Sequence, residues 1–332
     1  MNPIPLVRAR YAYAFAVVLD QLGVPLDKLL RDVKLPRNLL ENPNRLITAH
    51  QLWTFAGHAA READLPELGM LAGQVPVIEH GDFGRMVYET ITLYDAIKTF
   101  CDNAKTEYSR ADFYLTRDQQ QAWFCRGPID GEDAMQRQQV ELYVLIMMID
   151  TIRLGAGSQW QPSTIYLQTN DPRGLRDMPL LRNANLRFGC KRSGVAFPLE
   201  YLSKPLHGDI TAFTKPENQP EDILLHTDFS ASLRLVLKNY LIGQAPTLDT
   251  TAEIVGIRPR TLQRRLSQSG LSYQAIIDQT RFELAAELIK DTNLKLTEIA
   301  FELGYSEASH FTRAFRRWAG MTPKEYRRYH AV

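Results

Sequence analysis

Apolar side chains recur at helical spacing from the start of the chain. Between Val7 and Leu22 they return every three or four positions, which predicts an amphipathic helix. Arg8 and Arg10 precede an apolar run, as they would in a secretion signal, but Asp20 and Gln21 follow it without a small-residue cleavage pattern. We therefore expect a helix of a folded domain here. No stretch of about 18 apolar residues occurs in the chain, so the sequence predicts no membrane span.

Further helices follow, and prolines separate them. Thr48 is the predicted N-cap of a helix that runs through Trp53. Long apolar-periodic stretches predict two more helices, over 83–108 and 140–154. The prolines that fall near predicted helix boundaries are Pro25, Pro36, Pro43 and Pro66.

Between these helices the apolar pattern changes to a period of two. Alternating apolar residues over 111–126, on both sides of the polar segment 118–121, predict a β-hairpin. Short strand-like runs follow at 164–168 and 195–198. Helices mixed with short strands predict an α/β domain over residues 1–205.

The segment 206–221 has the composition of a linker, with Gly208, Pro216 and Pro220 among polar residues. Residues 222–332 are then helical throughout, which predicts an all-α second domain. From Glu253 to the end there are 13 basic and 9 acidic residues, a net charge of +4, whereas the rest of the chain carries 26 and 29. The basic surplus at this end favours a polyanionic partner.

The C-terminal domain contains an imperfect internal repeat. In the first copy Gly256 follows Ala252, and in the second Gly304 follows Ala300, each after four positions. The small alanine allows two helices to approach closely, and the glycine can adopt the positive φ of a tight turn. A second helix begins at once in each copy. The pattern is typical of a helix-turn-helix unit, and its repetition predicts two such units.

The second helix of each unit has an apolar and a basic face. Leu262 and Leu266 point to one side of the first such helix and Arg264 to the other, and Arg313 takes the matching place 49 positions later. Arginine on such a face can donate two hydrogen bonds to guanine in the major groove, a pair worth about 1–3 kcal/mol of discrimination. The alternative is that these arginines are ordinary solvated charges. Because both copies have the same turn and the same arrangement of apolar and basic faces, we favour contacts with DNA. In the second copy we assign Phe311, Phe315 and Trp318 to the apolar face and Ser309 and Arg316 to the outer face.

A helix over about 272–291 is predicted to join the two units. Twenty helical residues span about 30 Å, close to one turn of DNA. One chain is therefore expected to place two recognition helices in successive major grooves.

At these residues the sequence resembles the AraC/XylS family of bacterial transcription regulators. The matching motifs are R-T-L-Q-R-R-L at 260–266, I-A at 299–300 with G-Y-S-E at 304–307, F-T-R-A-F-R-R-W at 311–318 and G-M-T-P-K-E-Y-R at 320–327. The resemblance implies a seven-helix DNA-binding domain that usually activates transcription, with double-stranded promoter DNA and RNA polymerase as partners. Arg258 stands where the family often has a serine N-cap before Pro259, and we expect it to contact phosphate.

Two sets of DNA contacts follow from this resemblance and from the helix faces. For Arg265 and Arg317, solvation of the surface is an equal alternative to a phosphate contact. The expected base-reading residues are Arg260, Arg264, Ser309, His310 and Arg313, and the expected phosphate contacts are Arg258, Gln263, Arg265, Thr312, Arg316 and Arg317.

In the first domain, H-G-D-F-G at 80–84 and T-L-Y-D-A-I at 92–97 resemble the arabinose-binding-type sensor domain of one branch of the family. The resemblance does not make arabinose the ligand. We expect a small effector to bind here and to control DNA binding or contact with RNA polymerase. The alternative is a ligand-free module for dimerisation or partner binding. Aromatic residues could line an apolar pocket, and His58, Arg110 or Arg126 could anchor an acidic group, although no spacing singles one out.

Composition sets the remaining limits. Hydrophobic residues make up 45% and charged residues 23% of the chain, which is typical of a soluble folded protein. Cys101, Cys125 and Cys190 form no C-x-x-C pair, so we expect neither a disulfide framework nor a metal site. H-E-x-x-H, G-x-S-x-G, G-x-G-x-x-G and phosphate-loop motifs are absent from the sequence. We therefore expect a cytoplasmic protein that is not an enzyme and needs no cofactor.

Overall fold

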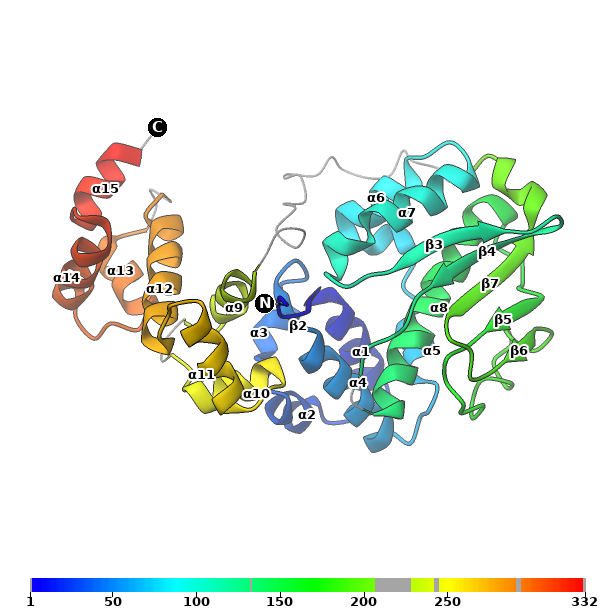
Figure 1. Ribbon diagram of the computed structural model, residues 1–332, viewed down its shortest axis with the longest axis horizontal. Helices are drawn as coiled ribbons and strands as arrows, with labels where there is room; N and C mark the ends of the chain where they lie inside the picture. Colours follow the sequence, from blue (N-terminus) through cyan, green and yellow to red (C-terminus); the bar gives the residue numbers. More distant parts are fainter. Residues whose placement is uncertain (1, 132, 207–227, 242–244, 291–293, 331–332) are drawn as a thin grey trace. The chain divides into compact units, whose positions relative to one another are not determined.

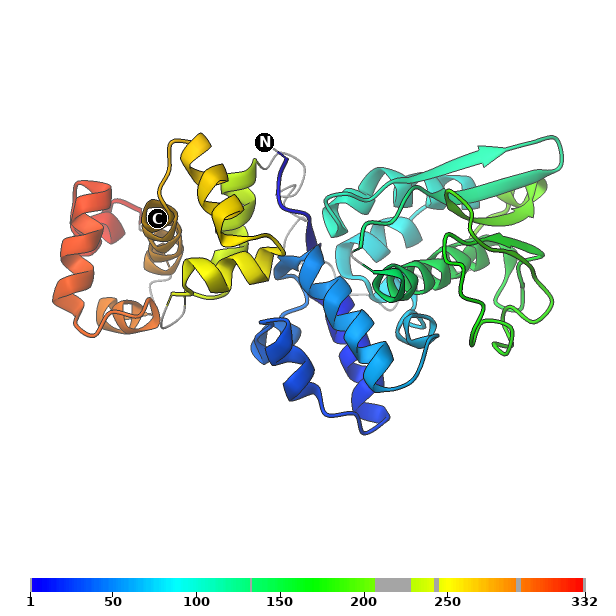
Figure 2. The same ribbon diagram turned by 60° about the horizontal axis from the view of Figure 1, so that its bottom comes forward.

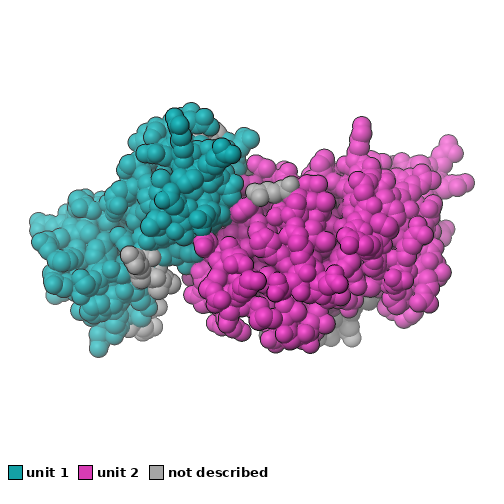
Figure 3. Space-filling view, turned by 90° about the horizontal axis from the view of Figure 1, so that it is seen from below, with its two compact units in different colours: residues 1–4, 227–332 teal, residues 5–226 magenta. Residues whose placement is uncertain are grey.

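The computed structural model describes residues 2–131, 133–206, 228–241, 245–290 and 294–330. The chain forms two compact units, residues 5–226 and residues 1–4 together with 227–332 (Figure 3). The first four residues, which we assigned to the first domain from the sequence, thus group with the C-terminal unit. Apart from Leu206, the predicted linker 206–221 lies outside the described residues, so its bounds stay a prediction.

The first unit combines helices and strands, as the mixed pattern predicts (Figure 1). Its helical elements are α1 (Arg10–Gln21), α2 (Leu26–Asp32), α3 (Arg37–Leu40), α4 (Ala49–Glu62), α5 (Leu68–Ala72), the 3-10 turn η1 (Val77–Glu79), α6 (Gly81–Tyr88), α7 (Leu93–Glu107), α8 (Ala134–Ala156) and the 3-10 turn η2 (Leu199–Ser203). Its strands are β1 (Leu6–Arg8), β2 (Leu46–Thr48), β3 (Phe113–Arg117), β4 (Gln121–Arg126), β5 (Thr164–Tyr166), β6 (Asn185–Arg187) and β7 (Ser193–Pro198).

Five of these strands form one sheet in the order β3-β4-β7-β5-β6. Neighbours are antiparallel except for β5 and β6, which are parallel. The predicted hairpin is confirmed as β3 and β4, and its turn is fastened by the carboxylate of Asp118. That carboxylate accepts hydrogen bonds from the backbone N–H groups of Gln120 and Gln121, at 2.9 and 2.8 Å. A small separate sheet pairs β1 with β2.

Helices α7 and α8 cover one face of the large sheet (Figures 1 and 2). Phe100 of α7 packs edge-on against Phe113 of β3, with ring centroids 5.0 Å apart. Glu141 of α8 accepts a hydrogen bond from Ser193 of β7 at 2.5 Å. The strand register places Phe113 opposite Arg126 and Phe124 opposite Val195, so all four side chains belong to this inner face.

Several local features differ from the sequence pattern. The helix predicted over 83–108 is two helices, α6 and α7, because the chain breaks at 89–92 and Thr92 caps α7 with its side chain. Val7 lies in β1, before α1 begins. The predicted cap at Thr48 is confirmed, and it forms a full capping box with Gln51. Helix α8 contains the predicted 140–154 and begins earlier, at Ala134, after an Asp133 cap.

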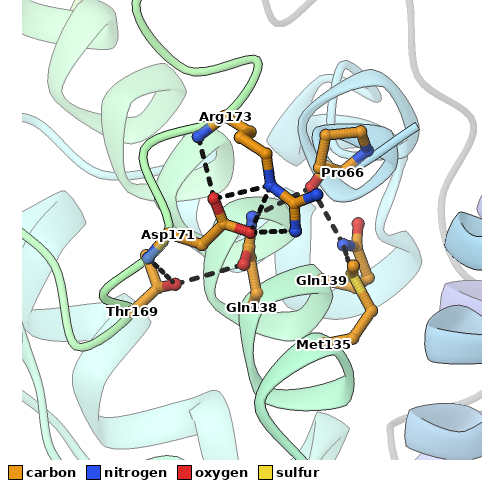
Figure 4. A network of polar contacts seen from close by, with 7 residues as sticks. All are labelled: Pro66, Met135, Gln138, Gln139, Thr169, Asp171 and Arg173. Atoms are coloured by element: carbon orange, nitrogen blue, oxygen red, sulfur yellow. Dashed lines mark hydrogen bonds and ion pairs between the residues drawn. The ribbon is translucent and has the colours of Figure 1, made fainter. Parts of the chain in front are cut away.

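Polar side chains on the first half of α8 fasten two loops to it (Figure 4). Gln138 and Gln139 both donate to the carbonyl of Pro66, at 3.1 and 3.0 Å, ahead of α5. On the other side, the Thr169 hydroxyl donates to the Gln138 carbonyl oxygen at 3.2 Å. Asp171 in the same loop pairs with Arg173. These contacts account for glutamines that are buried in a long apolar helix.

The C-terminal unit is helical in all of its described regular elements. The N–H of Ile4 donates to the Ser232 hydroxyl at 3.0 Å, and Ile4 is 2% exposed. No described helix of the protein is long and apolar enough to cross a membrane. The helices of this unit are α9 (Phe229–Leu237), α10 (Leu248–Val255), α11 (Pro259–Gln268), α12 (Tyr273–Lys290), α13 (Leu296–Glu302), α14 (Ala308–Ala319) and α15 (Pro323–His330).

Candidate nucleic-acid interface

Two matching turns organise the C-terminal unit. The helix pairs α10–α11 and α13–α14 each meet at a left-handed glycine, Gly256 with φ +73° and Gly304 with φ +78°. In both turns the N–H of the residue after the glycine donates to the carbonyl of the alanine four positions before that glycine, at 3.0 Å. This is the same Schellman-type ending in both units. The predicted turns are therefore confirmed, and both alanines, Ala252 and Ala300, are fully buried.

Helix α11 follows the first turn and has the two predicted faces. Leu262 and Leu266 are 0% and 1% exposed, which anchors the helix to the core of the unit. Arg260 and Arg264 are exposed, and no hydrogen bond or ion pair to another described residue engages either side chain. Both guanidinium groups are therefore available to an external acceptor. Gln263 is exposed on the same helix.

The two remaining arginines of α11 differ from each other. Arg258 occupies the N-cap position without a side-chain capping bond and is exposed, as expected for a phosphate contact. Arg265 is half-buried, and its guanidinium carbon lies 5.2 Å from the ring centroid of Phe229 in α9. Stacking on this ring competes with a phosphate for the same guanidinium group.

Helix α14 follows the second turn. Phe311 and Phe315 are 1% and 0% exposed, whereas Ser309, His310 and Arg313 are exposed. Trp318, which we assigned to the buried stripe, is only partly buried. The two arginines with matching places in the repeat, Arg264 and Arg313, thus both lie on exposed faces of the second helix of their unit.

One acidic residue at the start of α14 was not singled out from the sequence. Glu307 is the N-cap residue, and its carboxylate accepts a hydrogen bond from the Ser309 hydroxyl at 3.0 Å. The same carboxylate lies 3.8 Å from Nε2 of His310. It therefore orients two of the expected base-reading side chains. A carboxylate at this place can also accept a hydrogen bond from cytosine N4.

The phosphate contacts expected on α14 fall into two groups. Arg316 is exposed and forms no ion pair with the described residues. Arg317 is exposed too, but its Nη2 donates to Asp278 of α12 at 3.2 Å. The Thr312 hydroxyl donates to the carbonyl of Ala308 at 2.9 Å and keeps its lone pairs free as acceptors. Arg316 is therefore the better placed of the two arginines for a phosphate.

Helix α12 connects the two helix-turn-helix units, as predicted. Its 18 residues span about 27 Å. Phe282 of this helix packs against Phe315 and Trp318 of α14, with ring centroids 5.5 and 6.3 Å apart. Near its C-terminus, the carbonyl of Ile289 accepts a hydrogen bond from Nε of the half-buried Arg327 at 3.1 Å. These contacts hold the middle of α12 against α14 and its C-terminal end against α15.

The structure also separates the three cations proposed as effector anchors in the first unit. Arg110 is exposed and pairs with Asp130 at 3.1 Å. His58 is half-buried on α4 and does not line the apolar cavity described below. Arg126 is 4% exposed and lines that cavity. Only Arg126 of the three is therefore placed to meet a buried ligand.

Two helix-turn-helix units joined by one helix define a DNA-binding transcription regulator. Family models agree with this geometry: residues 251–329 match a helix-turn-helix domain, and residues 23–206 match the N-terminal arabinose-binding domain of AraC transcription regulators. The chain belongs to the AraC family.

Known proteins resemble the chain over its whole length or over part of it. The ornithine utilization regulator of Pseudomonas aeruginosa is 25% identical over 336 residues, which cover 97% of this chain and 96% of that protein. The regulator VirS of Mycobacterium tuberculosis is 36% identical over 154 residues, 44% of each chain. Among solved structures, the transcriptional regulator CdpR from Pseudomonas aeruginosa aligns with a TM-score of 0.43 and 17% identity over 96% of this chain and 98% of CdpR. Both of the relatives matched by sequence are named as regulators.

Proposed function

We propose that this AraC-family regulator reads a specific promoter sequence through α11 and α14 together. The observation that supports this most is the repeated turn, which presents Arg264 and Arg313 on matching exposed faces without intramolecular partners among the described residues. Arg260, Ser309 and His310 complete the proposed base contacts. The proposed phosphate contacts are Arg258, Gln263, Arg265, Thr312, Arg316 and Arg317, of which Arg265 and Arg317 already have partners within the protein.

Substitution of the two matched arginines tests this proposal. Arg264→Ala and Arg313→Ala should each relax base preference in one part of the site and lower specific affinity about 5- to 150-fold, the equivalent of 1–3 kcal/mol. Arg316→Ala should instead weaken binding to all sequences and reduce the slope of affinity against salt by about 1. Footprints and binding curves on promoter DNA at several salt concentrations measure both effects.

A charge-matched control is available in the first unit. Arg182 is exposed there, and Arg182→Ala should leave footprint and affinity as they are in the unmodified protein. If Arg264→Ala and Arg313→Ala behaved like this control, α11 and α14 would not be the helices that read DNA.

We propose further that a small molecule bound in the first unit controls this DNA binding, and that the regulator activates transcription by contacting RNA polymerase in the cytoplasm. The match of residues 23–206 to a ligand-binding family domain supports the first part. The ligand-free alternative, a module for dimerisation or partner binding, predicts a stable dimer whose DNA affinity does not respond to any small molecule. Transcription from the promoter with purified RNA polymerase, with and without ligand, distinguishes activation from repression.

A further inference from the structure

The first unit contains a cavity of about 60 Å³ between α1, α4, α7, α8 and the β3–β4 hairpin. That volume has room for roughly four water molecules. Its wall is mostly aromatic and aliphatic, and among the described residues that line it only Glu107 and Arg126 carry a charge. The aromatic part of the wall includes three phenylalanines. The ring of Phe100 packs edge-on against those of Phe83 and Phe113, with ring centroids 4.9 and 5.0 Å apart.

Arg126 occupies a place where the strand pattern calls for an apolar side chain. It lies on the inner face of the sheet, opposite Phe113 and in the same row as Ser193. Its guanidinium carbon is 5.6 Å from the centroid of the Phe113 ring. Nη1 is fully buried without a hydrogen-bond partner, and no ion pair holds the group among the described residues. A buried guanidinium N–H group without an acceptor is costly, so Nη1 is able to take an acceptor from a ligand.

Three carboxylates act on Arg126 through their charge, Glu141, Asp130 and Asp112, and the first two are engaged by other groups. Glu141 accepts hydrogen bonds from the Ser193 hydroxyl and from the backbone of Gln168 and Thr169, at 2.5 to 2.8 Å. Asp130 pairs with Arg110 at the surface. Glu107, the other charged lining residue, lies 3.5 Å from Nε of Arg10. Of the two charged lining residues, Glu107 thus has an ion pair within the described part of the chain, although its Oε2 accepts no hydrogen bond, whereas Arg126 has no ion pair there.

A second donor without a partner belongs to another residue that lines the cavity. Trp53 of α4 is 5% exposed, and its Nε1 is buried without a hydrogen-bond partner. The ring of Tyr108, which also lines the cavity, packs edge-on against Trp53 with centroids 5.4 Å apart, and burial lowers the pKa of Arg126. Two buried donors on a mostly apolar wall favour a ligand that brings both an acceptor and a hydrocarbon body.

We propose that this cavity binds a short-chain carboxylic acid, with its carboxylate on Arg126 and Trp53 and its hydrocarbon part against the Phe100 and Phe113 rings. Binding of this acid is independent of the proposed function. Only its role as the effector that controls DNA binding rests on that function. The volume favours a molecule of about the size of butyrate. A free pentose is excluded because it would bury several hydroxyl groups against a wall with few partners for them.

Titration of the full chain with matched small molecules tests the proposal. Butyrate should bind and raise the melting temperature, whereas butyramide and 1-butanol, similar in size but uncharged, should bind at least 10-fold more weakly, and L-arabinose should not bind. Isothermal titration with acetate, butyrate, hexanoate and benzoate then defines the length that fits. Equal affinity for butyrate and 1-butanol, or binding of arabinose alone, would overturn the proposal.

Two variants assign the binding to this site. Arg126→Met keeps the length of the side chain and should reduce butyrate affinity at least 10-fold. Because it removes an unpartnered buried charge, it should leave the melting temperature of the ligand-free protein unchanged or higher. A strongly destabilised Arg126→Met protein would show that Arg126 is a structural cation instead. Trp53→Phe keeps the aromatic wall without Nε1 and should weaken butyrate binding 3- to 10-fold; unchanged affinity would contradict the assigned site.

The same experiment separates this proposal from effector control. If butyrate binds but promoter affinity does not change, the cavity assignment holds and control by this ligand fails. If no carboxylate binds while Arg264→Ala still alters the footprint, the cavity assignment fails and DNA reading stands.

Discussion

His80 is a buried histidine beside the cavity of the first unit. It is 1% exposed, and its Nε2 lies 3.1 Å from the hydroxyl of Tyr143. Burial lowers the pKa of His80 to about 4, and the nearby charge of Arg10 acts in the same direction. In the unfolded chain the pKa is near 6.5, so between these values the unfolded state binds more protons. The free energy of unfolding must therefore fall as the pH drops from about 6.5 toward 4.

We predict that His80 lowers the free energy of unfolding by about 3 kcal/mol as the pH falls from about 6.5 to 4. The substitution His80→Gln should remove this contribution. The measurement is guanidinium unfolding at pH 6.5, 5 and 4 for both proteins. Burial raises the pKa of Glu107 and Glu141, so these groups favour folding at lower pH and oppose the effect. They are present in both proteins, and the difference between the two curves isolates His80. Identical pH dependence of the two proteins would refute the role of His80.

Single residues of the DNA interface and of the cavity could be predicted to different extents. The exposed positions of Arg264 and Arg313 were predictable because a helical period of about 3.6 residues places them opposite the buried leucines and phenylalanines, and their base contacts stay a prediction. The carboxylate of Glu307 was not, because its role depends on the N-cap geometry of α14. Arg126 could only be named as one cation among three, since its place on the inner face follows from strand register, which pairs residues far apart in sequence.

At the scale of the elements, the left-handed turn that ends α10 is open to a direct test. Gly256 has φ +73° and ψ 36°, a conformation that costs a residue with a Cβ about 1–2 kcal/mol. Gly256→Ala should therefore lower the stability of the C-terminal unit by about that amount, as measured by thermal unfolding. Gly256→Asn is the matched control, because asparagine tolerates this conformation better and should lose less. Equal stability of all three proteins would mean that the turn relaxes without strain.

The sequence pattern predicts some helices and strands and misses others. The β3–β4 hairpin and the two helix-turn-helix turns were predictable because local side-chain chemistry determines them. The break between α6 and α7 was missed because apolar residues continue at helical spacing across 89–92. Strands β1, β2 and β6 have three residues each, too few to show alternation. Pairing of β1 with β2 joins Leu6 to Thr48, a contact that no local pattern contains.

At the scale of the whole molecule, the spacing of the DNA subsites should be restricted. Helix α12 is continuous over 18 residues, about 27 Å, and packs against α14. Insertion of 5 base pairs between the two subsites rotates one of them by about half a turn. We expect at least a 10-fold loss of affinity, to the level of DNA with a single subsite.

Binding curves on inserted and uninserted promoter fragments measure this loss. Insertion of 10 base pairs returns both subsites to the same face of the DNA but separates them by about 34 Å more. Because α12 cannot span this extra distance, full affinity should not be recovered. The control is DNA with the same number of base pairs added outside both subsites. If affinity were insensitive to insertion between the subsites, the two units would bind independently.

The grouping of residues 1–4 with the C-terminal unit has a practical consequence for dissecting the protein. Expressing residues 222–332 alone would omit Ile4, which is 2% exposed and whose N–H donates to Ser232 on α9. The fragment would then leave an apolar site and a hydroxyl group on α9 uncovered. Studies of DNA binding by a truncated protein should therefore supply residues 1–4 in trans or by fusion, since a cut between the units alone does not reproduce the intact C-terminal core.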